Sequence, residues 1–199
     1  MSKDFRTAVQ DRRSIYGLGR EVAISDEKIL DVIRHAVKFS PTAFHSQSGR
    51  VIVLFQKSHE KLWDITKTIL KNRVSEDQFA RTEEKINSFR SAYGTVLYFE
   101  DQTVIEGLQK QFPAYQENFP IWSQQSSGML QYVIWTGLEA EGLGVSLQHY
   151  NPLIDDEVRK EFDVPASWKL IAQMPFGAPT AKAGEKQFQS VEERIKIFK

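Results

Sequence analysis

The chain has 199 residues, of which 41% are hydrophobic and 26% are charged, a composition typical of one globular domain with its own core. Lysine plus arginine and aspartate plus glutamate number 26 each, so no overall field attracts a nucleic acid or an anionic membrane, and we expect neither as a partner. The absence of cysteine excludes disulfides and sulfur-based zinc sites and fits a reducing compartment such as the cytoplasm.

The first predicted elements are helices. No apolar signal core precedes them, and no stretch approaches the roughly 20 apolar residues that a spanning helix needs. Apolar side chains recur at helical spacing over residues 5–9, which predicts a first helix that ends near Ser14. Ser25 is a suitable N-cap for a second helix with acidic residues in its first turn, and this helix must stop before Pro41.

Two short apolar runs rich in β-branched residues, at 51–55 and 95–99, predict strands that are buried on both faces. Between them, Ser58 is expected to cap a further helix. The strongly charged stretch over residues 71–90 that follows is interpreted as a solvated helical excursion.

The second half of the chain mixes helices and strands irregularly. A long helix is predicted over residues 121–141 and is closed by Gly142. After it come a strand at 145–148, a short helix at 154–162, a strand at 168–174 and an extended arm over 177–199. Because the alternation of a doubly wound fold is missing, we predict an α+β fold, in a single domain over residues 1–199.

Three segments carry donor groups suited to an anionic or planar ligand. Arg12, Arg13 and Ser14 place two guanidinium groups beside a hydroxyl, a set that suits a phosphate dianion, although arginines at a helix end are also often simply solvated. The loop at 40–49 offers backbone and side-chain donors at the start of a strand, or is a plain turn. Lysines in the arm supply point charges to a phosphate or remain solvated.

Several common active sites are excluded. The Gly-Leu-Gly at 142–144 ends a helix and lacks the third glycine of a dinucleotide-binding fingerprint. The four histidines lack the spacing of a metal-binding helix face, and we expect no metal. Nucleophile-elbow, Walker and EF-hand motifs are also missing, which leaves hydrolase and triphosphatase mechanisms without an anchor.

Taken in order, four segments resemble the FMN-dependent nitroreductase family, and the resemblance spans nearly the whole chain. They are RRSIY at 12–16, SPTAFHSQ at 40–47, GLGVSLQHYNP at 142–152, and FGAP at 176–179 with Lys186. Each motif is weak alone, but the order and spacing of all four are specific. The segments at 40–44, 118–123 and 147–152 further resemble the small copper-inducible branch of the family.

The resemblance implies a nitroreductase-like fold, with a central mixed or antiparallel sheet flanked by helices, in an intertwined homodimer. Two FMN molecules are expected at the subunit interface. The resemblance implies that the FMN phosphate and ribityl chain contact Arg12, Arg13, Ser14 and Lys186. From the opposite subunit it implies contacts by Pro41, Thr42, Ala43, His45, Gln47 and Ser126. It places Tyr16, Leu147, Gln148 and His149 around the isoalloxazine ring, with a backbone N–H of this turn near flavin N5.

Three positions depart from the family pattern. His45 stands where many relatives have asparagine, and Tyr16 stands where several have a lysine near the pyrimidine edge of the flavin. Relatives often carry an arginine at the position of Phe188, so more of the phosphate-binding role falls on the remaining cations.

The implied activity is electron transfer from NAD(P)H to nitroaromatic or quinone-like acceptors by a ping-pong mechanism. Flavin N5 carries the chemistry, so no catalytic side chain is expected. The acceptors are expected to be small planar aromatics that stack on nearby rings. An FMN-binding sensor or flavin reservoir without substantial turnover is the alternative, and a structural helical dimer without cofactor is a third.

Overall fold

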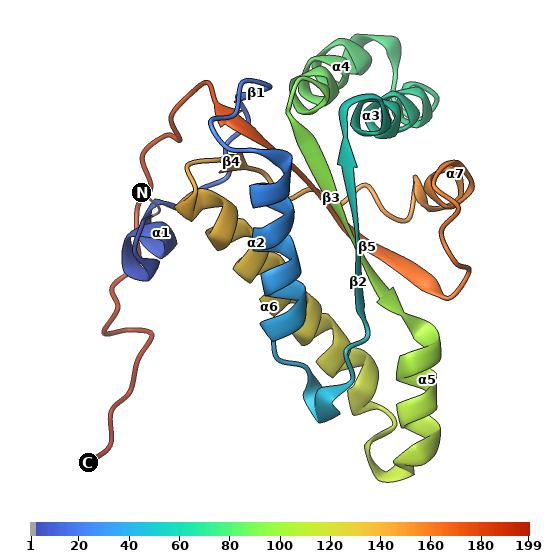
Figure 1. Cartoon of the computed structure of the whole chain (residues 1–199), viewed down its shortest axis with the longest axis vertical. Helices are drawn as coiled ribbons and strands as arrows, with labels where there is room; N and C mark the ends of the chain where they lie inside the picture. Colours follow the sequence, from blue (N-terminus) through green and yellow to red (C-terminus); the bar gives the residue numbers. More distant parts are fainter. Residues whose placement is uncertain (1–2) are drawn as a thin grey trace.

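A five-stranded sheet forms the centre of the computed structural model, which describes residues 3–199 (Figure 1). The strands are β1 (Leu18–Gly19), β2 (Gly49–Phe55), β3 (Gly94–Asp101), β4 (Gly144–Val145) and β5 (Trp168–Pro179). Their order is β1-β5-β3-β2, and β4 pairs with β5 beside this path. Every pair of named strands is antiparallel, so the antiparallel form of the expected sheet is the correct one.

Helices pack around this sheet and complete an α+β fold, which confirms the predicted class. They are α1 (Phe5–Asp11), α2 (Asp26–Phe39), α3 (Gln56–Lys71), α4 (Glu76–Arg90), α5 (Gln102–Gln111), α6 (Asn118–Ala140) and α7 (Asp155–Glu161), with short 3-10 turns η1 (Ala43–His45) and η2 (Pro113–Tyr115). Among residues 3–199, none of these helices combines the length and the apolar character that crossing a membrane requires.

The helices α2 and α6 cover one face of the sheet, and their apolar side chains form the larger part of the core. Ile29 and Ile33 lie one turn apart on α2, and Ile134 and Leu138 are related in the same way on α6. All four are buried against β3 and β5, where Met174 is also fully enclosed. Spacing by four residues places each pair on one helix face, so burial follows directly from the sequence pattern.

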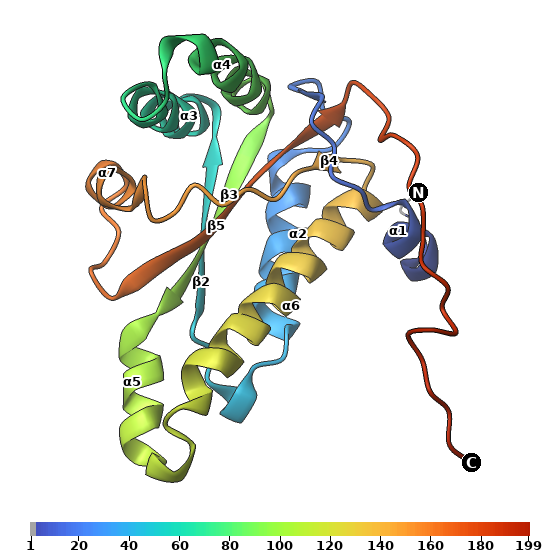
Figure 2. The same ribbon diagram turned by 180° about the vertical axis from the view of Figure 1, so that it is seen from behind.

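The helices α3, α4 and α7 cover the opposite face (Figure 2). Trp63 of α3 and Phe89 of α4 are fully buried, with their ring centroids 5.0 Å apart. Val158 of α7 and Leu97 of β3 belong to the same cluster. The charged stretch over 71–90 is therefore helical as predicted, but its last turns contribute to the core.

The position of each strand decides how deeply it is buried. All eight residues of β3 are buried, because β2 and β5 flank it and helices cover both of its faces, as predicted. The prediction that β2 is also buried on both faces is wrong. Only Leu54 of that strand is buried, because β2 is the outer strand of the sheet.

The second predicted helix is confirmed with its cap. The hydroxyl of Ser25 accepts a hydrogen bond from the N–H of Lys28 at 3.3 Å, and α2 ends at Phe39, before Pro41. The predicted helices over 121–141 and 154–162 correspond to α6 and α7 within a few residues.

The first helix is shorter than predicted. It ends at Asp11 and not near Ser14. The N–H of Ile15 donates to the carbonyl of Val145 at 2.9 Å, and Ser14 forms a parallel bridge with the same residue. Pairing with a distant strand therefore holds this segment extended.

Other boundaries also differ from the prediction. Ser58 lies inside the first turn of α3, whose N-cap is Phe55. The strand predicted at 145–148 shortens to β4, whereas β5 continues to Pro179 because its end pairs with β1 and β4. The extended arm thus starts after Pro179. The elements β1 and α5 were not predicted.

Gly177 lies in the closely packed end of β5. A Cβ at this position would collide with the carbonyl oxygen of Gly19 and lie 3.0 Å from the backbone nitrogen of Tyr93. Since backbone atoms cannot rotate away, we expect Gly177→Ala to lower the free energy of unfolding by about 1–3 kcal/mol in urea titrations. Gly107→Ala is the matched control, because no neighbour lies within 4 Å there. In helix α5 that change is expected to stabilise by about 0.5–1 kcal/mol. Equal stability of Gly177→Ala and wild type would contradict the tight approach.

Candidate functional site

A cavity of about 540 Å³ opens between the segment after α1 and the start of the carboxy-terminal arm. Its lining includes Arg12, Arg13, Ser14, Tyr16, Lys182 and Lys186. None of the described residues that line it is acidic. We call it the cationic cavity. It brings together every residue that the resemblance assigned to the phosphate, and adds Lys182, whose signal in the sequence was only its place in the arm. An adjoining cavity shares Arg13, Lys182 and Lys186 and is also lined by Asp11 and Glu139, whose carboxylates both pair with Lys3.

Backbone hydrogen bonds to the sheet hold both walls of the cationic cavity. On one side the N–H of Ile15 donates to Val145 of β4. On the other, the N–H of Thr180 donates to the carbonyl of Gly17 at 2.9 Å, just after β5 ends. The guanidinium of Arg13 then reaches across and donates to the carbonyl of Gly184 in the arm at 2.9 Å. The cations are thus placed by the corner where β1, β4 and β5 meet.

Arg12 is held by aromatic stacking and keeps an unused donor. Its guanidinium carbon lies 4.6 Å from the ring centroid of Trp135 and 5.8 Å from that of Tyr132, both on α6. Its Nε atom is buried and has no hydrogen-bond partner among residues 3–199. An unpaired buried donor is costly, so this atom favours an anionic acceptor in the cavity.

A second cavity, of about 350 Å³, lies where the end of α2 and the loop at 40–48 meet α6 and the outer strand β2. Of the residues assigned to the opposite subunit, Thr42, Gln47 and Ser126 line it. The others, Pro41, Ala43 and His45, belong to the same loop but are not part of the lining. We call it the loop cavity. Its lining also contains residues that the sequence analysis did not single out, namely Ser40, Arg50, Glu100 and Trp168.

The loop itself is compact and strained. The N–H of Gln47 donates to the Thr42 hydroxyl at 3.1 Å, which closes the loop on itself. Phe44, His45 and Gln47 all have φ near +50°, a region that side chains other than glycine seldom occupy. Such conformations persist only where the surrounding packing enforces them.

Aromatic packing around Phe44 holds the loop in this conformation. The ring of Phe44 stacks on Trp122 with centroids 5.8 Å apart and planes at 19°. It also contacts Phe112, Tyr115 and Phe119, and we call these five residues the aromatic cluster. Phe119 is buried, whereas Phe44 and Tyr115 are half exposed. The cluster provides flat apolar surface beside the loop. Its signal in the sequence is the run of aromatic residues at 112–122.

The turn after β4 offers free backbone N–H groups, but the N–H of Gln148 is not one of them. Gln148 donates its N–H to the carbonyl of Gln173 at 2.7 Å and accepts the N–H of Gln173 in return at 2.9 Å. Its side-chain amide donates to the Ser146 hydroxyl at 2.8 Å. In extended backbone the neighbouring N–H groups point the other way. Those of Leu147 and His149 make no hydrogen bond within residues 3–199, and they are the donors left for a ligand.

Within one chain the predicted residues form separate groups. The cationic and loop cavities share no lining residue. The amino-terminal segment reaches the end of α6, where the N–H of Lys3 donates to the carbonyl of Ala140, whereas η1 packs near the start of that helix (Figure 2). A ligand that contacts both cavities therefore requires a second chain.

Burial changes the acidity of two groups near these cavities. It raises the pKa of Glu100, in the loop cavity, to about 7, although the Ser48 hydroxyl and Arg50 oppose the shift. It raises the pKa of Tyr150, which follows the turn, to about 12. The phenol of Tyr150 therefore stays protonated at neutral pH, whereas Glu100 titrates there.

Comparison with known proteins assigns the family. Residues 9–178 match the model of the nitroreductase family. The nitroreductase FRM2 of Saccharomyces cerevisiae is 33% identical over 188 residues, which cover 93% of each chain. The nitroreductase CinD from Lactococcus lactis, solved in complex with chloramphenicol, is 46% identical with a TM-score of 0.90, over 98% of this chain and 100% of that one. CinD has also been solved with 4-nitrophenol.

A more distant structure shares the fold. A protein of Desulfovibrio desulfuricans, solved in complex with FMN, is 19% identical with a TM-score of 0.71 and covers all of both chains. The family match over most of the sequence, together with relatives above 30% identity along nearly the full length, is decisive. The chain belongs to the nitroreductase family of oxidoreductases.

Proposed function

We propose that the protein is a homodimeric, FMN-dependent oxidoreductase that passes electrons from NAD(P)H to nitroaromatic or quinone-like acceptors. The observation that carries the proposal is the cationic cavity, in which Arg12, Arg13, Lys182 and Lys186 converge and whose described lining contains no acidic residue. The unpaired Nε of Arg12 fits a phosphate dianion. In support, the distant relative named above was solved with FMN, and CinD with 4-nitrophenol.

In this proposal the chain holds and orients the cofactor. Arg12, Arg13 and Lys186 bind the phosphate, and Ser14 donates from the same wall. The free N–H groups of Leu147 and His149 serve the ring. FMN, when bound, supplies a ring nitrogen that accepts a hydride and later gives electrons to the acceptor. No side chain of this chain is then required to form a covalent bond.

The other half of the site comes from a second chain. Pro41, Thr42, Ala43 and His45 lie in the strained loop, with Gln47 and Ser126 beside it, far from the cations of their own chain. We propose that they complete the cofactor site of the partner. The aromatic cluster then flanks the same site, where planar acceptors stack.

Exposed apolar surface supports this dimer. Phe5 of α1 and Met129, Tyr132 and Val133 of α6 are exposed on one side of the molecule. A cavity of about 200 Å³ lies among them, lined almost entirely by apolar groups. Contiguous apolar surface of this kind marks a protein interface.

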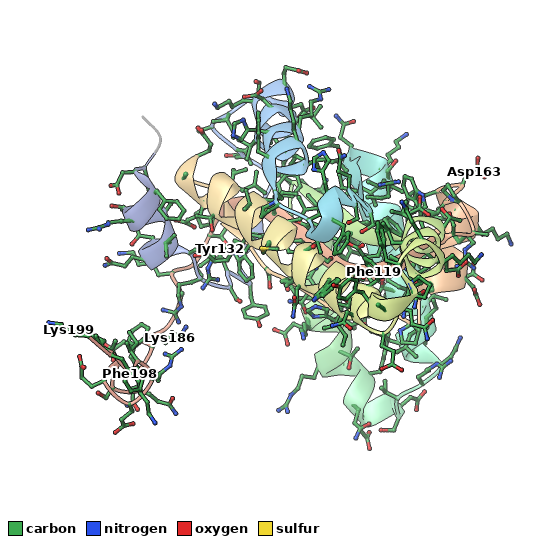
Figure 3. The ribbon with its side chains drawn as sticks, turned by 90° about the horizontal axis from the view of Figure 1, so that it is seen from below. Phe119, Tyr132, Asp163, Lys186, Phe198 and Lys199 are labelled. Atoms are coloured by element: carbon green, nitrogen blue, oxygen red, sulfur yellow. The ribbon has the colours of Figure 1, made fainter. Side chains whose placement is uncertain are left out.

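The carboxy-terminal arm also exposes apolar side chains. It leaves the sheet after Pro179 and extends away from the body of the chain (Figures 1 and 3). Phe188 is 78% exposed and Phe198 is 91% exposed. Arg13 holds the start of the arm at Gly184, and the apolar side chains exposed further along it fit an intertwined dimer in which the arm wraps the partner.

The electron-transfer proposal predicts a colour change. The purified protein, loaded with FMN, is expected to absorb between roughly 350 and 500 nm and to bleach rapidly when mixed anaerobically with NADH or NADPH. Steady-state assays with a nitroaromatic acceptor are expected to give parallel double-reciprocal plots. Persistent colour would favour a flavin-binding sensor or reservoir, and intersecting plots would exclude simple ping-pong turnover.

The phosphate clamp is tested by Arg12→Ala. Loss of this charge-assisted contact is expected to weaken FMN binding by about 1.5–3 kcal/mol, measured by equilibrium titration of the apoprotein. Arg81→Ala, on the exposed side of α4, is the matched loss of one charge and is expected to bind FMN like wild type. Unchanged affinity in Arg12→Ala would remove this residue from the clamp.

The dimer is tested by placing a charge on the apolar face. Val133→Glu is expected to shift the protein from twice the chain mass to the monomer mass in light scattering, because an unpaired carboxylate cannot be buried cheaply at an interface. It is also expected to release FMN. Gln78→Glu on exposed α4 adds the same charge and is expected to remain dimeric. A wild-type monomer that retains flavin tightly would contradict the shared site.

A further inference from the structure

The loop cavity contains two buried polar atoms that nothing in the chain satisfies. Glu100 is 1% exposed, and its Oε1 atom has no hydrogen-bond partner among residues 3–199. The hydroxyl oxygen of Ser40, at the end of α2, is also buried without a partner. Both residues line the same cavity. Buried polar groups are nearly always paired, so two unpaired atoms in one cavity point to a missing ligand.

One oxygen of Glu100 is satisfied and the other is not. The Ser48 hydroxyl donates to Oε2 at 2.6 Å, so Oε1 is the oxygen free to carry a proton toward a ligand when the carboxyl is neutral. In its neutral form Glu100 therefore presents an O–H donor beside the cavity.

The charged neighbours do not neutralise Glu100 by pairing with it. Arg50 of β2 donates instead to Asp101 at 3.0 Å and to the carbonyls of Gln47 and Gly49. Lys169, opposite Glu100 on β5, is exposed. From α2 and α6 the cavity is lined by uncharged residues, namely Val37, Ser40, Ser126 and Leu130. Burial raises the pKa of Glu100 to about 7, so the neutral form predominates below neutrality.

The cavity also has the dimensions and walls of a site for a single aromatic ring. Its volume of about 350 Å³ is at the lower end of ligand pockets, too small for a whole flavin nucleotide. Val37, Val51, Leu130 and Trp168 give it apolar surface. A flat ring packs against such walls, and its polar substituent must then meet the two unpaired atoms.

We propose that Glu100 and Ser40 form a subsite for the electron acceptor, in which the carboxyl and the hydroxyl donate hydrogen bonds to a nitro or quinone oxygen. This inference rests on the proposed function, because it assigns the loop cavity to the acceptor that the flavin of the partner reduces. Nitro and carbonyl oxygens only accept hydrogen bonds, so they match two donors. Carboxylate-bearing rings are disfavoured once Glu100 ionises.

The test compares nitrobenzene with isopropylbenzene, which has nearly the same shape but no acceptor oxygen. Dissociation constants are measured by NMR titration of the full-length, flavin-loaded, oxidised protein without reductant. At about pH 6 we expect wild type to prefer nitrobenzene roughly tenfold, as one or two neutral hydrogen bonds provide. At about pH 8, above the pKa of Glu100, the donor is lost and the preference is expected to fall to about threefold.

Three variants separate the role of Glu100 from that of Ser40. Glu100→Gln places an amide donor at the same position and is expected to keep the preference at both pH values. Glu100→Leu is expected to lose most of it at both. Ser40→Ala, which removes only a hydroxyl, is expected to reduce the preference about threefold and covers the case in which Glu100→Leu does not fold.

The result that overturns the inference is an equal nitrobenzene preference in wild type, Glu100→Leu and Ser40→Ala, or the same fall with pH in Glu100→Gln as in wild type. Flavin absorbance and anaerobic bleaching by NADH are recorded on the same samples. Failure of bleaching in wild type counts against the proposed function, whereas normal bleaching with an unchanged preference overturns the subsite alone.

Discussion

The pairing of β5 on both of its edges is the constraint on which the rest of the structure depends. Along most of its length β5 pairs with β3, and at its end it also holds β1 and β4. Three chain segments converge there: the cationic stretch after α1, the turn after β4, and the arm. Gly177 permits this convergence, because the backbones of Gly19 and Tyr93 approach it too closely for a side chain. Main-chain hydrogen bonds thus bring the basic side chains together, and these side chains need few contacts of their own to hold them in place.

The two cavities differ in charge and shape, and the proposed cofactor contacts residues of both. The cationic cavity is open and carries four basic side chains, which suits the highly charged end of a nucleotide. The loop cavity is smaller and contains apolar walls with a few buried polar atoms, which suits an uncharged ring. In the proposed dimer, the exposed face on α6 and the carboxy-terminal arm would bring the two cavities of different chains together.

The sequence predicted those elements whose own side-chain pattern determines them. Ile29 and Ile33 on α2, and the continuous apolar run of β3, are buried because their spacing permits only one arrangement. The paired arginines and Lys186 are weak signals by themselves, because such cations are often simply solvated, and it was the resemblance to the family that singled them out. The structure places them in one cavity.

Features that depend on distant partners could not be predicted in this way. The end of α1 is set by the hydrogen bond from Ile15 to Val145, more than a hundred residues away. The partial burial of β2 follows from its place at the edge of the sheet, which no local pattern specifies. Glu100 looked like an ordinary polar residue at the end of a strand. Only the fold shows that Ser48 satisfies one of its oxygens and leaves the other unpaired.

The stacking of Arg12 on Trp135 limits which substitutions the sequence of α6 can accept during evolution. One helix, α6, supplies the aromatic ring beneath Arg12 and also the exposed apolar side chains that we propose as the dimer face. Substitutions along it must therefore satisfy two selective pressures at once. Neutral drift is expected to accumulate instead on the outer surface of α4, at exposed residues such as Gln78 and Arg81.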